Sequence, residues 1–211
     1  MYTNLIFDFD GVLVDSNKIR IEGFRQLYQS SSTEVMDLFI KYVSINHGFS
    51  RYKKINFYYE NLIYQKIDAE TIQRDANHYS LIVKDAVVNA NEIPGALAFL
   101  DDSVHTFSLA LVSSSDQSEL CQICEQRGIS NYFKAILGSP TEKSTNIIKL
   151  IQEFQWSLDN TVYIGDSVND LVAARSANIQ FIGFGRTNFS EVNKSFYTVE
   201  NFTELSKLLL K

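Results

Sequence analysis

The feature that most constrains the fold is an apolar segment that runs directly into two aspartates one residue apart. Residues 5–7 are apolar, and Asp8, Asp10 and Gly11 follow at once. Asp is a poor strand residue and like charges repel, so two carboxylates at a strand end need a compensating partner. A hard divalent cation meets this need, because Mg²⁺ is commonly bound by one or two carboxylates together with water and substrate phosphate oxygens. A plain turn that closes a buried strand is the alternative, since Asp and Gly are common in turns.

The same three residues are suited to chemistry at phosphorus. With a metal in place, one aspartate can attack phosphorus as a nucleophile while its neighbour serves as general acid and base. Gly11 lets the chain leave the strand in a tight turn beside a ligand. We therefore predict that Asp8 and Asp10 are catalytic residues and metal ligands.

A second apolar segment ends in hydroxyl-bearing residues. Residues 107–112 form a near-continuous apolar run, typical of a strand buried on both faces, and Ser113, Ser114, Ser115 and Asp116 follow. Ligands of open α/β sheets bind at the carboxyl ends of the strands, where the N–H groups of a following helix attract anions. Ser113 and Ser114 are therefore candidate phosphate-binding residues. For the other two residues we favour a cap of the following helix.

A third apolar segment again runs into a carboxylate. Residues 161–164 lead through a glycine to Asp166, and Asp170 follows four residues later, ahead of small residues that could pack a helix closely on the sheet. The arrangement repeats the strand end at Asp8. Taken alone, Asp166 could also be a helix cap.

Lys143 is the candidate cation for this edge of the sheet. It follows a predicted loop at 138–142 and precedes apolar residues that recur along one helix face. A lysine at a helix N-terminus opposes the helix macrodipole, which indicates another role. There it would hold a phosphate and offset the charge of Asp8. Lys134 and Lys149 are the alternative positions, and a surface location for Lys143 is the simplest alternative.

Residues 17–90 differ from the rest of the chain in composition and in the spacing of their apolar residues. They contain no proline and no convincing strand, and their apolar residues recur three and four positions apart, as at 35–42 and 62–67. This pattern predicts a helical insertion. Because the insertion starts directly after the first carboxylate motif, we expect it to fold over the site as a cap that excludes water and selects the substrate. A helical subdomain that only stabilises the core is the alternative.

Within the insertion, Gly48 and its polar neighbours interrupt the helical pattern. Arg51 could direct its planar guanidinium group at a phosphate or carboxylate of a substrate, so it is a candidate substrate-binding residue. We expect His47, Lys53 and Lys54 to lie on a solvated helix face.

Length and charge limit the classes of partner. The chain has 211 residues, enough for one α/β core with an insertion, and its net charge of −6 comes with no basic stripe. Nucleic acid and an anionic membrane surface are therefore poor candidate partners. No apolar run is long enough to span a membrane, and the N-terminus lacks the pattern of a signal peptide. We expect a cytoplasmic protein, whose oligomeric state the sequence does not indicate.

Together these motifs resemble those of the haloacid dehalogenase-like phosphatase superfamily. Residues 8–16 are similar to its first motif, the strand ending at Ser113 to its second, Lys143 to its third and residues 165–170 to its fourth. The third motif departs from the Lys-Pro form of phosphoglycolate phosphatase-like members. Residues 48–51 resemble the Gly-x-Ser-Arg substrate loop in the cap of β-phosphoglucomutase-like members.

The resemblance implies a role for each candidate residue. Asp8 would be the nucleophile that forms an aspartyl-phosphate, and Asp10 would protonate the leaving oxygen and later activate water. Ser113 would bind the phosphate. Asp166 would complete the Mg²⁺ site directly, and Asp170 would support it through water or hydrogen bonds.

The predicted fold is a doubly wound, Rossmann-like parallel-sheet α/β core, residues 1–16 and 91–211, with an inserted α-helical cap at 17–90. The predicted function is Mg²⁺-dependent hydrolysis of a small phosphorylated metabolite. A sugar-phosphate mutase of the β-phosphoglucomutase type, which returns the phosphoryl group to a sugar, is one alternative, and a non-catalytic binding protein is another. Haloacid dehalogenation fits less well, because it has no use for Asp10. Further strands are predicted at 133–137, 181–184 and 197–199, and further helices at 96–100 and 201–210.

Overall fold

The structure is a computed structural model that describes residues 2–185, 189 and 195–209. Residues 1, 186–188, 190–194 and 210–211 of the predicted core lie outside the described residues. The last residue of the helix predicted at 201–210 is among them.

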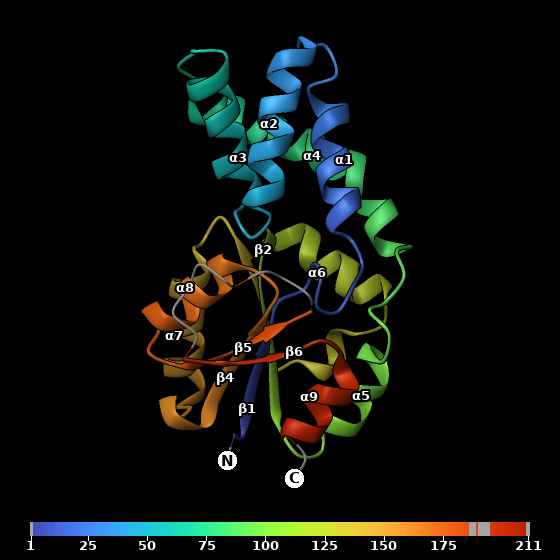
Figure 1. Cartoon of the computed structure of the whole chain (residues 1–211), viewed down its shortest axis with the longest axis vertical. Helices are drawn as coiled ribbons and strands as arrows, with labels where there is room; N and C mark the ends of the chain where they lie inside the picture. The colour runs from blue at the N-terminus through green and yellow to red at the C-terminus, as the bar shows by residue number, and fades with distance from the viewer. Residues whose placement is uncertain (1, 186–188, 190–194, 210–211) are drawn as a thin grey trace.

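Over the described residues, the core is a six-stranded sheet in which every neighbouring pair of strands is parallel (Figure 1). The strand order β3-β2-β1-β4-β5-β6 places the first strand in the middle. This order confirms the predicted doubly wound α/β fold. The strands are β1 (Asn4–Phe7), β2 (Ser108–Asp116), β3 (Ile136–Ser139), β4 (Thr161–Gly165), β5 (Gln180–Phe184) and β6 (Tyr197–Val199).

Helices cover both faces of the sheet, because successive strand side chains point to opposite sides. Leu5 and Phe7 of β1 pack in one apolar cluster with helices α5, α6 and α9, whereas Ile6 packs in a second cluster with α7 and α8. All three side chains are fully buried. Burial on both faces explains why the strands are continuous apolar runs in the sequence. The core helices are α5 (Ala96–Ser103), α6 (Gln117–Gln126), α7 (Lys143–Phe154), α8 (Val168–Ser176) and α9 (Phe202–Leu209).

The inserted segment is helical, as predicted, and lies above one end of the sheet in Figure 1. Serine or aspartate side chains cap three of its helices: Ser32, Ser50 and Asp68 each accept a backbone N–H bond at a helix start. Its helices are α1 (Asn17–Leu27), α2 (Thr33–Ile45), α3 (Arg51–Phe57) and α4 (Ala69–Val88), with a π-helical turn at Tyr58–Leu62. None of the described helices is both long and apolar enough to cross a membrane.

The apolar residues of the inserted segment belong to the same buried cluster as one face of the core. Phe24 of α1 packs against Tyr79 of α4 in a tilted arrangement with 4.2 Å between ring centroids, and it makes an edge-to-face contact with Phe39 of α2. The inserted helices and one face of the core therefore share a continuous buried apolar cluster. The division into a core and a separate cap domain at 17–90 stays our proposal.

Three predicted boundaries are wrong. Residues 63–67 are irregular chain, although their apolar spacing predicted helix. Strand β2 continues to Asp116, because this residue still pairs with Ser139 of β3. Strand β3 begins at Ile136 instead of 133, because residues 133–135 are irregular chain that follows a 3₁₀ turn at Ser130–Tyr132.

Candidate active site

The predicted site residues come together at the carboxyl ends of the three central strands. Asp8 follows β1, Ser113 lies in β2 and Asp166 follows β4, and β1 pairs in parallel with both neighbours. The N–H of Asp8 donates to the Ile164 carbonyl at 2.9 Å, so the sheet ladder itself fixes its backbone. One cleft is lined by six of the predicted residues: Asp8, Asp10, Arg51, Ser113, Ser114 and Lys143.

Gly11 allows the first and fourth motifs to touch. Its φ of +80° lies in the left-handed region, and a Cβ atom there would stand 2.1 Å from Asp166 Oδ2 and 2.4 Å from Asn17 Nδ2. Asn17 Nδ2 donates to Asp166 Oδ2 at 2.9 Å. Glycine is therefore required for Asp166 to lie beside the first strand end.

Three buried carboxylates form a group that fits a divalent cation. Oxygens of Asp8, Asp166 and Asp170 lie within 4.8 Å of one another. Among the described atoms, the Oδ1 oxygens of Asp8 and Asp166 are buried without a hydrogen-bond partner, a costly state for a carboxylate. Burial raises the pKa of Asp8 to about 8, and the neighbouring carboxylates act in the same direction against Lys143. A hard cation such as Mg²⁺, which prefers oxygen ligands, would bind the oxygens that lack a hydrogen-bond partner and would stabilise the charged form of Asp8.

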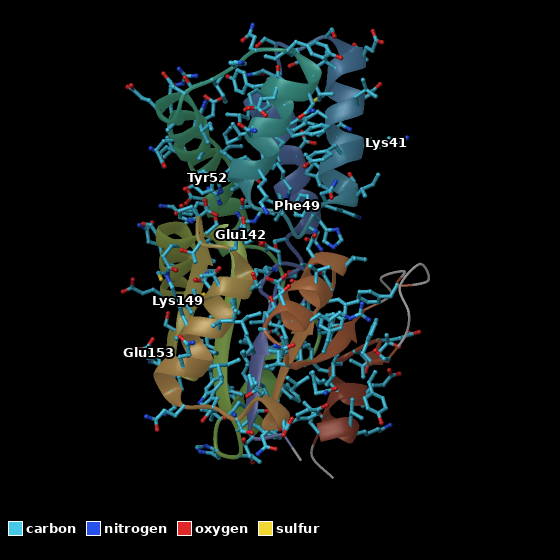
Figure 2. The ribbon with its side chains drawn as sticks, turned by 90° about the vertical axis from the view of Figure 1, so that its left-hand side faces the viewer. Lys41, Phe49, Tyr52, Glu142, Lys149 and Glu153 are labelled. Carbon is cyan, nitrogen blue, oxygen red and sulfur yellow. The ribbon has the colours of Figure 1, made fainter. Side chains whose placement is uncertain are left out.

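Lys143 lies at the ligand end of the sheet, where the sequence predicted it. Its Nζ is 3.0 Å from Asp8 Oδ2 and 2.5 Å from Asp170 Oδ1. Burial alone lowers the pKa of Lys143, but Asp170 and Asp8 hold it above its ordinary value, so the side chain is charged. The alternative lysines, Lys134 and Lys149, are exposed, and Figure 2 shows Lys149 on the outer surface of α7.

Asp170 is fully buried, and its oxygens are occupied by protein donors. Its Oδ2 accepts from the Ser167 N–H at 3.0 Å and the Ser167 hydroxyl at 2.6 Å, which makes a reciprocal cap at the start of α8. Its Oδ1 accepts from Lys143 and, at 3.3 Å, from the Tyr163 hydroxyl. These contacts fit a residue that supports the site more than one that supplies a free ligand.

Asp10 lies outside this carboxylate group and has its own set of donors. It accepts from the Ser16 hydroxyl at 2.5 Å, from Arg20 Nε at 2.9 Å and from the Ser115 hydroxyl at 2.8 Å. Burial raises the pKa of Asp10, but Arg20 and the two hydroxyls outweigh it, so the pKa lies below its usual value. The expectation that Ser115 caps α6 is wrong, because its hydroxyl binds Asp10. Asp116 makes that cap, accepting the N–H groups of residues 118 and 119.

A buried carboxylate that the sequence analysis missed joins two arginines. Glu119 Oε1 accepts from Arg20 at 2.5 Å, and both Glu119 oxygens accept from Arg51, at 2.7 and 2.9 Å. Arg51 also lies over the Tyr79 ring, 4.8 Å from its centroid. The arginine predicted to bind substrate thus lines the cleft while it is paired with α6. Its place in the sequence could have identified Glu119 as a candidate, since it lies three residues after Asp116, the last of the polar residues that follow the second apolar segment.

Glu119→Gln is expected to lower the free energy of unfolding by about 3 kcal/mol at pH 7, the usual scale for removing one partner of a buried ion pair. Burial raises the pKa of Glu119, but Arg20 and Arg51 lower it to about 2. This stabilisation is therefore complete above the unfolded pKa of 4.5 and is lost as the pH falls toward 2. Urea unfolding between pH 3 and pH 7 measures the difference. Glu125→Gln on the exposed side of α6 is the control, and an equal loss in both variants would contradict the assignment.

The loop at Gly48 closes the cleft from the inserted segment. The Ser114 hydroxyl donates to the Gly48 carbonyl at 2.6 Å, and a Cβ at Gly48 would stand 2.5 Å from Ser167 Oγ. The structure therefore engages Ser114 with this loop, while Ser113 accepts the Ser115 N–H at 3.1 Å and is 1% exposed. Figure 2 shows Phe49 where the inserted helices meet the core.

Two of the three residues expected on a solvated face are not there. Lys54 is 5% exposed and lines the cleft, and His47 Nε2 lies 3.6 Å from Asp166 Oδ1. Only Lys53 is exposed as expected, and it pairs with Glu142 at 2.9 Å. Charged residues on a helix face predict that the face is exposed to solvent, but here that face meets a polar cleft.

Comparison with curated proteins finds relatives that match either part of the chain or nearly all of it. A phosphoglycolate phosphatase from Vibrio parahaemolyticus is 33% identical over 82 residues, 36% of this chain and 36% of that protein, so the match spans only about a third of that relative. A phosphoglycolate phosphatase from Agrobacterium fabrum is 23% identical over 220 residues, 98% of this chain and 91% of that protein.

Solved structures show the same fold. A predicted phosphatase from Clostridium acetobutylicum has a TM-score of 0.79 at 22% identity, with 100% of this chain and 99% of that chain covered. A haloacid dehalogenase-like family hydrolase from Streptococcus pneumoniae has a TM-score of 0.73 at 18% identity, with 98% of each chain covered. The model of one family, haloacid dehalogenase-like hydrolase, matches residues 5–184, most of the chain. The chain therefore belongs to the haloacid dehalogenase-like hydrolase family, which confirms the resemblance of its motifs.

Proposed function

We propose that this hydrolase is a Mg²⁺-dependent phosphatase that acts on a small phosphorylated metabolite through an aspartyl-phosphate intermediate. The observation that carries the proposal is the group of Asp8, Asp166 and Asp170, in which two buried oxygens have no hydrogen-bond partner among the described residues, beside a buried lysine. The curated relatives, which are phosphoglycolate phosphatases, support a phosphate monoester as the substrate class.

Asp8 and Asp166 would hold the metal, and Asp170 would support it. We leave the carboxylate of Asp10, an expected ligand, out of this set because it lies outside the group and is bound by its own donors. When bound, Mg²⁺ would supply positive charge that neutralises the phosphoryl oxygens and the nucleophile.

The residues of the chain divide the remaining work. Asp8 attacks phosphorus in line, Lys143 offsets the charge of the transferring group, and the Ser113 hydroxyl donates a hydrogen bond to it. Asp10 gives a proton to the leaving oxygen and then takes one from the water that hydrolyses the intermediate. Arg20 favours the charged form of Asp10, which is the form the second step needs, and disfavours the protonated form that the first step needs. Binding of the substrate by Ser114 and Arg51 stays a prediction, since both have protein partners here.

The proposal is tested by phosphate release from a panel of phosphorylated metabolites and from 4-nitrophenyl phosphate, with and without Mg²⁺. We expect Mg²⁺-dependent release, and acid quenching should trap labelled phosphate on Asp8. Adding sugar acceptors separates the mutase alternative, because transfer to a sugar would replace release to water. Absence of turnover across the whole panel would contradict the proposal and favour a binding protein.

Asp10→Asn is expected to let the phosphoenzyme accumulate with 4-nitrophenyl phosphate. This leaving group departs without a proton, so the first step needs the acid least, whereas hydrolysis of the intermediate still needs the base. Steady-state turnover should fall by roughly 100-fold, within the usual range for a general acid–base residue. Rapid acid quench measures the phosphoenzyme. Equal levels of phosphoenzyme in the wild type and the variant would place Asp10 outside the second step.

A further inference from the structure

One cation in the cleft has no carboxylate partner. The cleft is lined by Arg20, Arg51, Lys54 and Lys143. Arg20 pairs with Asp10 and Glu119, Arg51 pairs with Glu119, and Lys143 pairs with Asp8 and Asp170. Within the described residues, no ion pair joins Lys54 to a carboxylate.

Lys54 is nevertheless buried, at 5% exposure. Its Nζ donates to the His47 carbonyl at 3.0 Å and lies 5.7 Å from the centroid of the Phe24 ring. One carbonyl satisfies only one of the three N–H donors of an ammonium group. Buried lysines are ordinarily paired, so a buried ammonium group at a cleft wall with spare donors is suited to an anion that arrives with a ligand.

The groups around Lys54 also favour the binding of an anion at its side chain. Burial lowers the pKa of Lys54 to about 7, and the cations Arg20, Arg51 and Lys143 add to the effect while Asp10 opposes it. A bound anion would favour the charged form and offset the repulsion among these cations. Apolar side chains of Phe24 and Val43 line the same cleft and can cover a short carbon chain.

We propose that Lys54 is a specificity-determining residue that binds a second anionic group, a carboxylate or a second phosphate, on the leaving-group side of the substrate. This inference rests on the proposed function, because it takes the phosphoryl group to be held at Asp8 and Lys143. Lys54 comes from helix α3 of the inserted segment, whereas the phosphoryl site is built from the core. The substrate would therefore bridge the two parts of the molecule, with one anion bound by each.

The test compares two matched pairs of substrates. The carboxylate pair is 2-phosphoglycolate and its amide, and the phosphate pair is propane-1,3-diol bisphosphate and the corresponding monophosphate. We expect wild-type kcat/KM to favour the anionic member of one pair by roughly 10- to 100-fold, the scale of one charge-assisted hydrogen bond. The pair that shows this ratio identifies the second anion as a carboxylate or a phosphate.

Lys54→Met should reduce that ratio at least about tenfold, and Lys54→Arg should retain most of it because the charge is kept. Lys53→Met is the matched control, since Lys53 is exposed on the same helix, and it should leave the ratio as in the wild type. Thermal unfolding of each variant checks the fold. A wild type without preference in either pair, or a Lys54→Met variant that loses activity equally on both members, would overturn the proposal.

A binding measurement separates this inference from the proposed function. Calorimetry in the Asp8→Asn background compares the affinity for each anionic compound with and without Lys54→Met, and it needs no turnover. If the wild type hydrolyses nothing while binding still depends on Lys54, the proposed function fails and the anion site stands. If binding of every probe is unaffected by Lys54→Met, the anion site fails whatever the activity.

Discussion

Asp8→Asn is expected to reduce phosphate release by on the order of 1,000-fold or more, because it removes the proposed nucleophile. The backbone of residue 8 is fixed by the sheet, where its N–H donates to Ile164, and Lys143 keeps Asp170 as a partner. The variant should therefore fold while losing the covalent step. Steady-state release from 4-nitrophenyl phosphate and acid-quench trapping of the phosphoenzyme measure the two effects.

The matched control for this substitution is Asp15→Asn, the same change at an exposed position of the first motif. It should retain activity near the wild-type rate. If Asp8→Asn released phosphate at a similar rate, with contaminating phosphatase excluded, the covalent mechanism would be wrong.

The same variant should be more stable than the wild type when divalent cations are removed. Burial raises the pKa of Asp8 to about 8, above the value of 3.8 for the unbonded carboxyl. The protonated form is thus the stable one in the fold, and wild-type stability falls as the pH rises from about 4 to about 8. Asp8→Asn removes this dependence, so the gap in melting temperature should widen over that range and shrink when Mg²⁺ is added.

Much of the fold and most of the central site follow from the sequence. Strands β1, β2 and β4 are buried on both faces, so their apolar runs are unmistakable, and each run leads directly into polar residues at the site. A parallel sheet brings such ends to one edge, which is why the sequence alone predicts that Asp8, Ser113 and Asp166 lie together. Lys143 could be added because a helix start is an unfavourable position for a lysine without an anionic partner.

The residues that the sequence did not identify are those set by packing between the inserted helices and the core. Along α3, Arg51, Lys54 and Ile55 are buried while Lys53 is exposed. Helical spacing places the first three on one face, but it does not say whether that face meets water or a polar cleft. Glu119 escaped for the same reason, since its two arginine partners lie 68 and 99 residues away.

Asp166→Asn is expected to raise the Mg²⁺ concentration for half-maximal activity by about 100-fold or more, the upper end of losses seen for residues around metal ions. Its Oδ1 has no hydrogen-bond partner among the described residues and lies 3.6 Å from His47 Nε2, whereas Oδ2 accepts from Asn17. The amide oxygen of Asn can keep the contact with Asn17, so the substitution removes charge and a ligand with little change in packing. Mg²⁺ titration of activity, and calorimetric titration without substrate, measure the effect.

Asp170→Asn should behave differently, because Asp170 is bound by Ser167, Lys143 and Tyr163. We expect its Mg²⁺ requirement to rise by about tenfold or less and its melting temperature to fall, since a buried ion pair and a helix cap are weakened. Asp159→Asn, at an exposed position before β4, is the control. A larger Mg²⁺ effect at Asp170 than at Asp166 would exchange their roles.

Ca²⁺ should inhibit, because its larger and more flexible coordination shell does not hold the in-line geometry that Asp8 needs. Activity that survives exhaustive chelation would remove the metal from the mechanism.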